Sequence, residues 1–308
     1  MSLDSNTPRI VYMGTPEFAV APLQSLYDSG VNIVGIVTVA DKQAGRGRKL
    51  QQSPVKTKAI ELGISILQPT NLKEEDFIND LRALNADLFV VVAFRMLPEQ
   101  VWMMPRLGTF NLHGSLLPKY RGAAPIHWAV INGEQQTGLT TFLLDKKIDT
   151  GGILLQRTID ITKNMTTGEL HDALLPLGAS MVVETVQGLM SGQLKPAEQL
   201  DRFATHAPKL NKENSKLDFN RSPQELVNQI HGLNPYPGAH YSGYKFLKAR
   251  KCDEYFENDL PKLSVREKHL FLDYAKGSIE IVEIKPSGKR NMSGKDFANG
   301  LNEAILAL

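Results

Sequence analysis

The feature that most constrains the fold is a regular alternation of strand and helix patterns over residues 1–190. Short apolar or β-branched runs predict strands at 10–13, 33–39, 65–68, 88–94, 109–113, 140–144 and 153–161. Helical patterns separate many of them, at 16–27, 53–63, 74–84, 124–132 and 167–190. This alternation predicts an α/β fold with a doubly wound, mostly parallel sheet. Leu88–Phe94 is the most apolar run and is expected to be a central strand covered on both faces.

The first strand-to-helix turn, Met13–Phe18, contains a single glycine, Gly14. It therefore does not match the G-x-G-x-x-G pattern of dinucleotide-binding sites. A tight turn is enough to explain Gly14. Thr15 is suited to cap the following helix, and Pro16 is suited to its first position.

The pattern changes after residue 190. Residues 191–215 are polar, contain Pro196 and Pro208, and are expected to form a linker. A helix is predicted over 222–231, and short β-rich runs follow at 239–249, 270–274 and 279–284, which is typical of a small β-barrel. We therefore predict an α/β domain over 1–190, a linker over 191–215 and a β-barrel domain over 216–308.

Cysteine content and charge restrict the classes of function. Cys252 is the only cysteine, so no internal disulfide and no cysteine-based zinc site can form. Residues 1–8 are polar and lack the apolar stretch of a signal peptide, and Leu88–Phe94 is far too short to span a bilayer. These features indicate a cytoplasmic protein without a membrane partner. The net charge is −1 over 1–190 and +3 over 191–308, which permits a polyanionic partner without requiring one.

Three polar residues are candidates for chemistry. Asn111 and His113 lie two apart on the predicted strand 109–113 and should project from the same face. They lie at the carboxyl end of that strand, where ligands bind in open α/β sheets. Asp149 precedes Gly151–Gly152, which allow close backbone approach. Each residue taken alone is better explained as a hydrogen-bonded strand end or a turn.

Together, an amide, an imidazole and a carboxylate suit acyl transfer to an amine. Attack by the amine produces an oxyanion, and one donor aimed at such an oxygen contributes about 2.7–4 kcal/mol. Asn111 and a protonated His113 can supply donors. Asp149 can orient His113, favour its protonated form and help to collect the amine proton. No nucleophilic Ser or Cys is needed, because the amine attacks directly.

The pattern Asn-x-His-x-Ser-Leu-Leu-Pro over 111–118, with a later Asp-x-Gly at 149–151, resembles the signature of the folate-dependent formyltransferases. Further segments resemble the members of that family that act on methionyl-tRNA: 9–18, 44–49, 53–56, 121–126, 232–238 and 291–297. The resemblance covers nearly the whole chain. It implies a Rossmann-like formyltransferase core and a C-terminal OB-like β-barrel that binds tRNA.

The same resemblance implies the reaction and its residues. The formyl group of 10-formyltetrahydrofolate would pass to the methionine amine of initiator methionyl-tRNA, without a metal. The resemblance assigns Asn111, His113 and Asp149 as the catalytic residues. It assigns folate contacts to Ser115, Leu116, Leu117, Pro118, Phe94, Met96 and Leu97. Arg95 stands where the family has a small residue, often glycine, and so bears on the shape of the folate pocket.

The basic, glycine-rich stretch 41–52 is either a solvated loop or an arm that contacts the acceptor end of a tRNA. In the family this loop contacts tRNA, and the resemblance assigns that role to Arg46, Arg48 and Lys49. The tRNA interpretation is favoured because this stretch, the linker and the basic second half occur together. Further candidate phosphate contacts, each of which could be simple surface, are Lys209, Lys212, Lys216, Lys245, Lys248, Arg250 and Lys251.

Two alternatives remain open. The acceptor could be an amino sugar nucleotide, since related formyltransferases have a similar C-terminal extension. The chain could also be a nucleic-acid-binding module whose first domain has lost activity. The second alternative is disfavoured because Asn111, His113 and Asp149 are all present. We expect a monomer.

Overall fold

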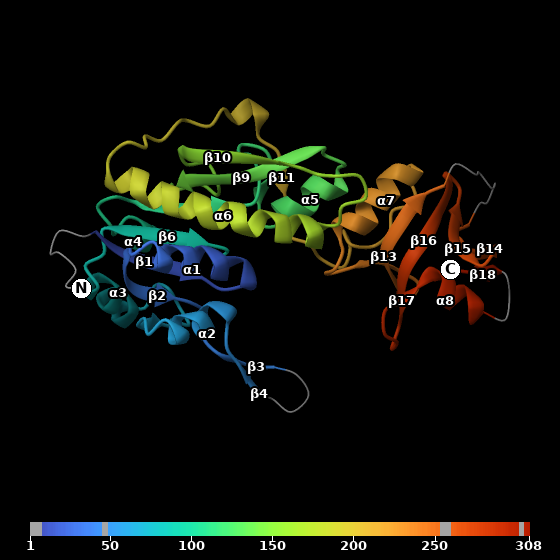
Figure 1. Cartoon of the computed structure of the whole chain (residues 1–308), viewed down its shortest axis with the longest axis horizontal. Coiled ribbons are helices and arrows are strands. Elements are labelled where there is room, and N and C mark those ends of the chain that lie inside the picture. Colours follow the sequence, from blue (N-terminus) through green and yellow to red (C-terminus); the bar gives the residue numbers. More distant parts are fainter. Residues whose placement is uncertain (1–7, 45–48, 253–259, 302–304) are drawn as a thin grey trace. The chain divides into compact units, whose positions relative to one another are not determined.

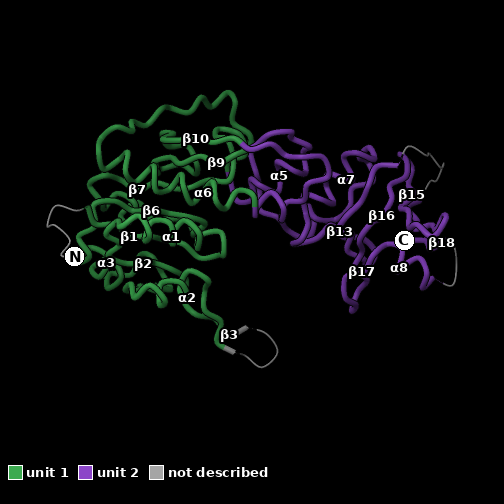
Figure 2. Tube along the Cα trace, viewed as in Figure 1, with its two compact units in different colours: residues 1–121, 138–158, 173–205 green, residues 122–137, 159–172, 206–308 purple. Residues whose placement is uncertain are grey.

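A computed structural model describes residues 8–44, 49–252, 260–301 and 305–308. The chain divides into two compact units (Figure 2). The first unit contains residues 1–121, 138–158 and 173–205, and the second contains 122–137, 159–172 and 206–308. The second unit thus takes in two segments from the first 190 residues. The division into 1–190, 191–215 and 216–308 stays a prediction about independently folding parts.

A seven-stranded sheet organises the first unit. Its strands are β1 (Arg9–Gly14), β2 (Asn32–Val37), β5 (Ile66–Leu67), β6 (Leu88–Val92), β7 (Thr109–His113), β9 (Gln136–Leu143) and β10 (Ile153–Asp160). They lie in the order β10-β9-β7-β6-β1-β2-β5. The pairs from β5 to β7 are parallel, whereas β9 is antiparallel to β7. The predicted mostly parallel sheet is confirmed, and β6 is central and completely buried.

Helices cover both faces of this sheet (Figure 1). They are α1 (Val20–Asp28), α2 (Pro54–Glu61), α3 (Glu75–Ala83), α4 (Glu99–Trp102) and α6 (Thr167–Met190), with the 3₁₀ turn η1 (Glu17–Ala19) before α1. Alternate residues of β1 and β6, such as Met13 and Phe89, pack in one apolar cluster with α3 and α4. On the other face the Tyr12 hydroxyl donates a 2.6 Å hydrogen bond to the Ala19 carbonyl. Gly178 of α6 lies so close to β7 that an added Cβ would be 3.0 Å from Leu112.

Helix α6 is long and apolar enough by length and composition to cross a membrane. Its residues Leu174, Val182 and Val186 are nevertheless completely buried within the protein. Core helices of soluble proteins share this length and composition, so α6 alone is weak evidence for a membrane span.

Two local predictions are corrected. Thr15 does not cap the first helix: η1 intervenes, its N-cap is Pro16, and no side chain caps it. The stretch 41–52, predicted as a loop, contains the short antiparallel hairpin β3 (Lys42–Ala44) and β4 (Lys49–Gln51). Strands of three residues are too short for an alternating pattern to reveal them. Ser53 caps α2, since its side chain accepts a 3.0 Å hydrogen bond from the Lys56 amide.

The second unit is built on an antiparallel sheet. Its strands are β12 (Ala239–Tyr241), β13 (Tyr244–Lys251), β14 (Lys262–Arg266), β15 (His269–Tyr274), β16 (Gly277–Pro286), β17 (Met292–Ser293) and β18 (Ile305–Ala307). They pair in the order β12-β13-β16-β15-β14-β18, with β17 on β16. The predicted C-terminal β domain is therefore confirmed. β14, β17 and β18 and helix α8 (Gly294–Asn299) were not predicted.

Helices α5 (Pro125–Ile131) and α7 (Pro223–Gly232) belong to the second unit. The two-residue strands β8 (Arg121–Gly122) and β11 (His206–Ala207) pair with each other, and the chain passes from the first unit to the second within β8. The 3₁₀ turn η2 (Asp201–Phe203) lies in the last segment of the first unit. Ser222 and Glu225 form a capping box at the start of α7. Apolar residues of α7, including Leu226 and Ile230, are completely buried against the sheet. This shared core holds α7 to the β domain.

Candidate active site

Strand β7 carries two of the predicted catalytic residues to the carboxyl edge of the sheet. Asn111 pairs in register with Val91 of β6 and with Phe142 of β9. Asn111 is half-buried, and its side-chain amide makes no hydrogen bond to another residue that the structure describes. Both the donor and the acceptor of this amide are therefore available to a ligand.

His113 is buried two residues further along β7. Its Nε2 lies 2.9 Å from the Tyr120 carbonyl oxygen, and because a carbonyl only accepts, Nε2–H is the donor. Its Nδ1 lies 3.7 Å from Oδ2 of Asp149, which is longer than a direct hydrogen bond but close enough for strong charge interaction. The structure thus brings the predicted His113 and Asp149 together. Nδ1 is the ring nitrogen left for proton transfer.

The loop that carries Asp149 is tightly folded. Asp149 has a φ of +55°, which residues other than glycine rarely adopt. Asp145 Oδ1 accepts hydrogen bonds from the Lys147 amide (2.9 Å) and the Thr150 hydroxyl (2.6 Å). A Cβ on Gly151 would lie 1.7 Å from the Leu143 carbonyl oxygen, so only glycine fits there. The chain therefore closes directly over the end of β9.

Gln199, which no sequence pattern marked, also contacts this loop. It lies in the predicted linker, yet its Nε2 donates to the carbonyl oxygens of Asp149 (3.0 Å) and Gly151 (2.8 Å). These partners are 50 and 48 residues away in sequence. No local pattern marks such a contact.

The turn after β7 contains four predicted folate contacts. Ser115 is completely buried and its hydroxyl donates a 2.6 Å hydrogen bond to the Lys119 carbonyl. Leu117 is also buried, and its amide donates to Thr140 Oγ1 at 3.1 Å. Leu116 and Pro118 are half-buried. Ser115 and Leu117 therefore shape the turn from within, and the assignment of all four residues to folate stays a prediction.

The three other predicted folate contacts follow β6. Phe94 is half-buried, Met96 is 71% exposed and Leu97 is buried. Arg95 between them turns to the segment before α3, where its guanidinium donates to the carbonyls of Pro69 and Thr70. These bonds fix the side chain that stands where a small residue was expected.

Comparison with known proteins identifies the family. Residues 8–186 match the formyl transferase family model, and residues 209–302 match the model of the formyl transferase C-terminal domain. The chain belongs to the formyl transferase family.

Individual relatives of this formyl transferase agree over nearly their whole length. The chain is 45% identical over 302 residues to a methionyl-tRNA formyltransferase of Flavobacterium johnsoniae, covering 95% of this chain and 96% of the relative. It is 43% identical over 301 residues to that of Caldanaerobacter subterraneus, covering 96% and 97%. Among solved structures, the sugar 3N-formyl transferase WlaRD matches with a TM-score of 0.68 at 22% identity, over 92% of this chain and 99% of that one. At this identity, the similarity to WlaRD shows a shared fold alone.

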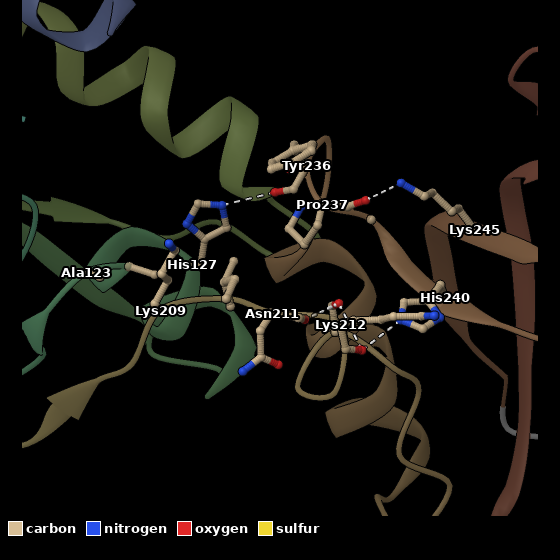
Figure 3. Close-up of a pocket in the computed structure, with 13 residues that line it drawn as sticks. Ala123, His127, Lys209, Asn211, Lys212, Tyr236, Pro237, His240 and Lys245 are labelled. Carbon is tan, nitrogen blue, oxygen red and sulfur yellow. Dashed lines mark hydrogen bonds between the residues drawn. The ribbon is translucent and has the colours of Figure 1, made fainter. Parts of the chain in front are cut away.

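The second unit of this formyl transferase contains a basic groove (Figure 3). The groove has a volume of about 560 Å³, and its lining includes Lys209, Lys212, Lys245, His127 and His240. Lys209 and Lys212 were predicted as tRNA contacts, and both are exposed. The structure thus gathers three lysines and two histidines from separate segments into one concave surface.

Backbone carbonyls hold several side chains of the basic groove in place. Lys245 Nζ donates to the Pro237 carbonyl at 2.6 Å, and His127 Nε2 lies 3.2 Å from the Tyr236 carbonyl (Figure 3). Burial lowers the pKa of His127, so this ring favours its neutral form. The Tyr236 side chain, at the same groove, is 78% exposed. The groove therefore combines positive charge with an exposed aromatic ring.

The other predicted tRNA contacts lie apart from this lining or cannot be placed. Lys216 is exposed, with its Nζ 5.4 Å from the centre of the Tyr241 ring. Arg46 and Arg48 lie outside the residues that the structure describes, and of Lys49 only the backbone, in β4, is described. In the described part of the chain, no group of three or more His, Cys, Asp or Glu side chains could hold a metal ion.

Proposed function

We propose that this chain transfers the formyl group of 10-formyltetrahydrofolate to the amino group of methionine on initiator methionyl-tRNA, for translation initiation. The observation that carries the proposal is the approach of Asp149 to His113, 3.7 Å from Oδ2 to Nδ1, at the end of the strand that also carries Asn111. Methionyl-tRNA formyltransferases that match over nearly the whole chain support the same acceptor.

The geometry suits direct attack by the amine. The amine nitrogen forms a bond to the formyl carbon, and the formyl oxygen becomes an oxyanion. The Asn111 amide and the protonated Nδ1 of His113 donate hydrogen bonds to that oxygen. Asp149, 3.7 Å from Nδ1, stabilises the imidazolium. Collapse breaks the bond from the formyl carbon to N10 of the folate, and the proton lost by the amine, collected by Asp149, ends on N10.

The predicted folate contacts complete the donor side of the site. The half-buried Phe94 offers an apolar surface to the pterin ring, and the buried Leu97 lies behind it in the same segment. The half-buried Leu116 and Pro118 lie in the turn that directly follows His113. Donor and catalytic residues would thus share the carboxyl edge of β6 and β7.

The basic groove supports a tRNA acceptor. Lysine side chains bind phosphates as point charges, and an exposed tyrosine can stack on an unpaired base. Lys209, Lys212 and Tyr236 provide both kinds of contact within the second unit. Arg46, Arg48, Lys49 and Lys216 are proposed to add further contacts, and a cytoplasmic monomer is the proposed state.

The acceptor is tested by offering two amines to the same enzyme. Purified protein receives labelled 10-formyltetrahydrofolate with either charged initiator methionyl-tRNA or an amino sugar nucleotide. We expect labelled formylmethionyl-tRNA, at a rate that falls steeply with added salt because phosphate contacts release counterions. Formylation of the sugar nucleotide alone would replace the proposed acceptor, and labelling of neither amine would contradict formyl transfer altogether.

A further inference from the structure

Gln199 connects two segments of the first unit through its side-chain amide. Its Nε2 donates to the carbonyls of Asp149 (3.0 Å) and Gly151 (2.8 Å). Its Oε1 accepts from Nε (3.1 Å) and Nη2 (2.8 Å) of Arg121, and Arg121 Nη2 also donates to Asp201 (2.8 Å). A primary amide has two N–H donors and two acceptor lone pairs, so every hydrogen-bonding position of Gln199 is used. The residue is only 6% exposed.

The partners determine which way the Gln199 amide points. Carbonyl oxygens only accept hydrogen bonds, and the N–H groups of Arg121 only donate them. Exchanging the nitrogen and the oxygen of the amide would set acceptors against acceptors and donors against donors. Gln199 is therefore held in one orientation.

Arg121 extends this connection to the histidine. It directly follows Tyr120, whose carbonyl accepts the 2.9 Å hydrogen bond from Nε2 of His113. The segment Tyr120–Arg121 thus holds His113 through its backbone and the Asp149 loop through Gln199. The two side chains that are held in this way, His113 and Asp149, face each other with 3.7 Å between Nδ1 and Oδ2.

Asp149 needs such support because its backbone lies in the left-handed region, with a φ of +55°. A residue other than glycine keeps this conformation only where its surroundings determine it. We propose that Gln199 is a positioning residue that holds Asp149 against His113 for formyl transfer. This role rests on the proposed function, in which Asn111, His113 and Asp149 are the catalytic residues. Gln199 itself is not one of them.

The test replaces Gln199 by Met, which keeps the size of the side chain and removes all four hydrogen bonds. We expect kcat to fall about 10- to 100-fold, with KM for methionyl-tRNA and for the folate donor unchanged, because a small misplacement of a catalytic group has effects of this size. In an Asp149→Asn background the same substitution should add little, since Gln199 acts through Asp149.

A matched control is Gln229→Met in the second unit. Gln229 is also buried, donates to the Lys216 carbonyl at 2.9 Å and accepts from the Asp218 amide at 3.2 Å. The Gln229→Met variant should lose stability as Gln199→Met does, and it should keep the wild-type kcat. If Gln199→Met fails to fold, Gln199→Glu retains an acceptor for Arg121, replaces the donor to the loop by a carboxylate oxygen that repels the two carbonyls, and should lower kcat at least as much.

A readout independent of activity separates this proposal from the proposed function. The ¹⁵N resonances of the His113 ring should move in Gln199→Met and stay in place in Gln229→Met, whether or not methionyl-tRNA is the acceptor. Absence of formyl transfer by the wild-type protein would contradict the proposed function alone. Unchanged His113 resonances, a wild-type kcat in a folded Gln199 variant, or an equal fold loss in the Asp149→Asn background would each overturn the positioning role.

Discussion

The Asp149 loop and the basic groove of the second unit hold their functional groups in different ways. The loop is fixed by hydrogen bonds that Asp145 accepts and Gln199 donates, and at Gly151 there is room for glycine alone. In the groove, Lys209 and Lys212 are exposed side chains of one irregular segment. Bond formation requires atoms held within fractions of an ångström, whereas phosphate binding tolerates mobile charges.

The largest effect should come from the rigid region. Asp149→Asn keeps the shape of the side chain and removes the carboxylate that is proposed to collect the amine proton. We expect kcat to fall about 10²- to 10⁴-fold, the range for a proton-transfer group. Binding of methionyl-tRNA, measured by filter retention, should keep its wild-type affinity and salt dependence. A parallel loss of tRNA affinity would contradict the assignment of the chemistry to the Asp149 loop and of tRNA binding to the basic groove.

An intermediate effect is expected from the groove. Changing Lys209 and Lys212 together to Gln removes two mobile charges, so kcat/KM for tRNA should fall while kcat at saturating tRNA stays near wild type. The slope of log affinity against log salt should decrease by about 1 for each lysine.

Lys73→Gln provides the control for these groove substitutions. Lys73 is equally exposed but lies in the first unit, beside α3. It should leave the salt slope unchanged. A slope that responds to Lys73 as much as to Lys209 and Lys212 would mean that general surface charge, and not the groove, attracts the tRNA.

The smallest effect concerns acid stability. A 2.8 Å hydrogen bond from the Thr166 amide, together with the Lys248 ammonium, lowers the pKa of Glu169 from 4.5 to about 2. Because the folded pKa lies below the unfolded one, this carboxylate stabilises the fold above about pH 4.5 and loses that contribution as the pH falls toward 2.

Urea unfolding of the wild type and of Glu169→Gln at pH 7 and pH 3 measures this contribution. The free energy of unfolding of the wild type should clearly exceed that of Glu169→Gln at pH 7 and exceed it by less at pH 3. The difference should be modest throughout, since half of the Glu169 side chain is exposed to screening solvent. A difference that grows at pH 3 would contradict the assignment.

Sequence patterns predicted the parts of the fold that periodicity controls. The run Leu88–Phe94 was predicted as a central strand because a fully apolar run is stable only when buried on both faces, and β6 occupies Leu88–Val92 of it. The antiparallel β domain followed from short β-rich runs after Pro237. β3, β14 and β18 were not predicted because segments of three to five residues are too short for a pattern to distinguish them from loops.

The candidate site was predictable where its residues lie close in sequence. Asn111 and His113 share a strand, so their common face followed from a period of two. Their approach to Asp149 rested on resemblance, and the roles of all three stay a prediction. Gln199 lies in a polar stretch that was predicted as a linker. No local pattern marked it, because its partners Arg121 and Asp149 are distant in sequence. Contacts of this kind follow from the fold and not from a local pattern.

The most direct test of the account is a single-turnover measurement of formyl transfer from 10-formyltetrahydrofolate to charged initiator methionyl-tRNA, with the wild type and with His113→Ala. The account predicts rapid formation of formylmethionyl-tRNA by the wild type. It predicts a rate lower by about 10²- to 10⁴-fold in the variant, with tRNA binding intact. Transfer by His113→Ala at the wild-type rate would contradict the assignment of the catalytic residues, and no transfer by either protein would contradict the proposed reaction.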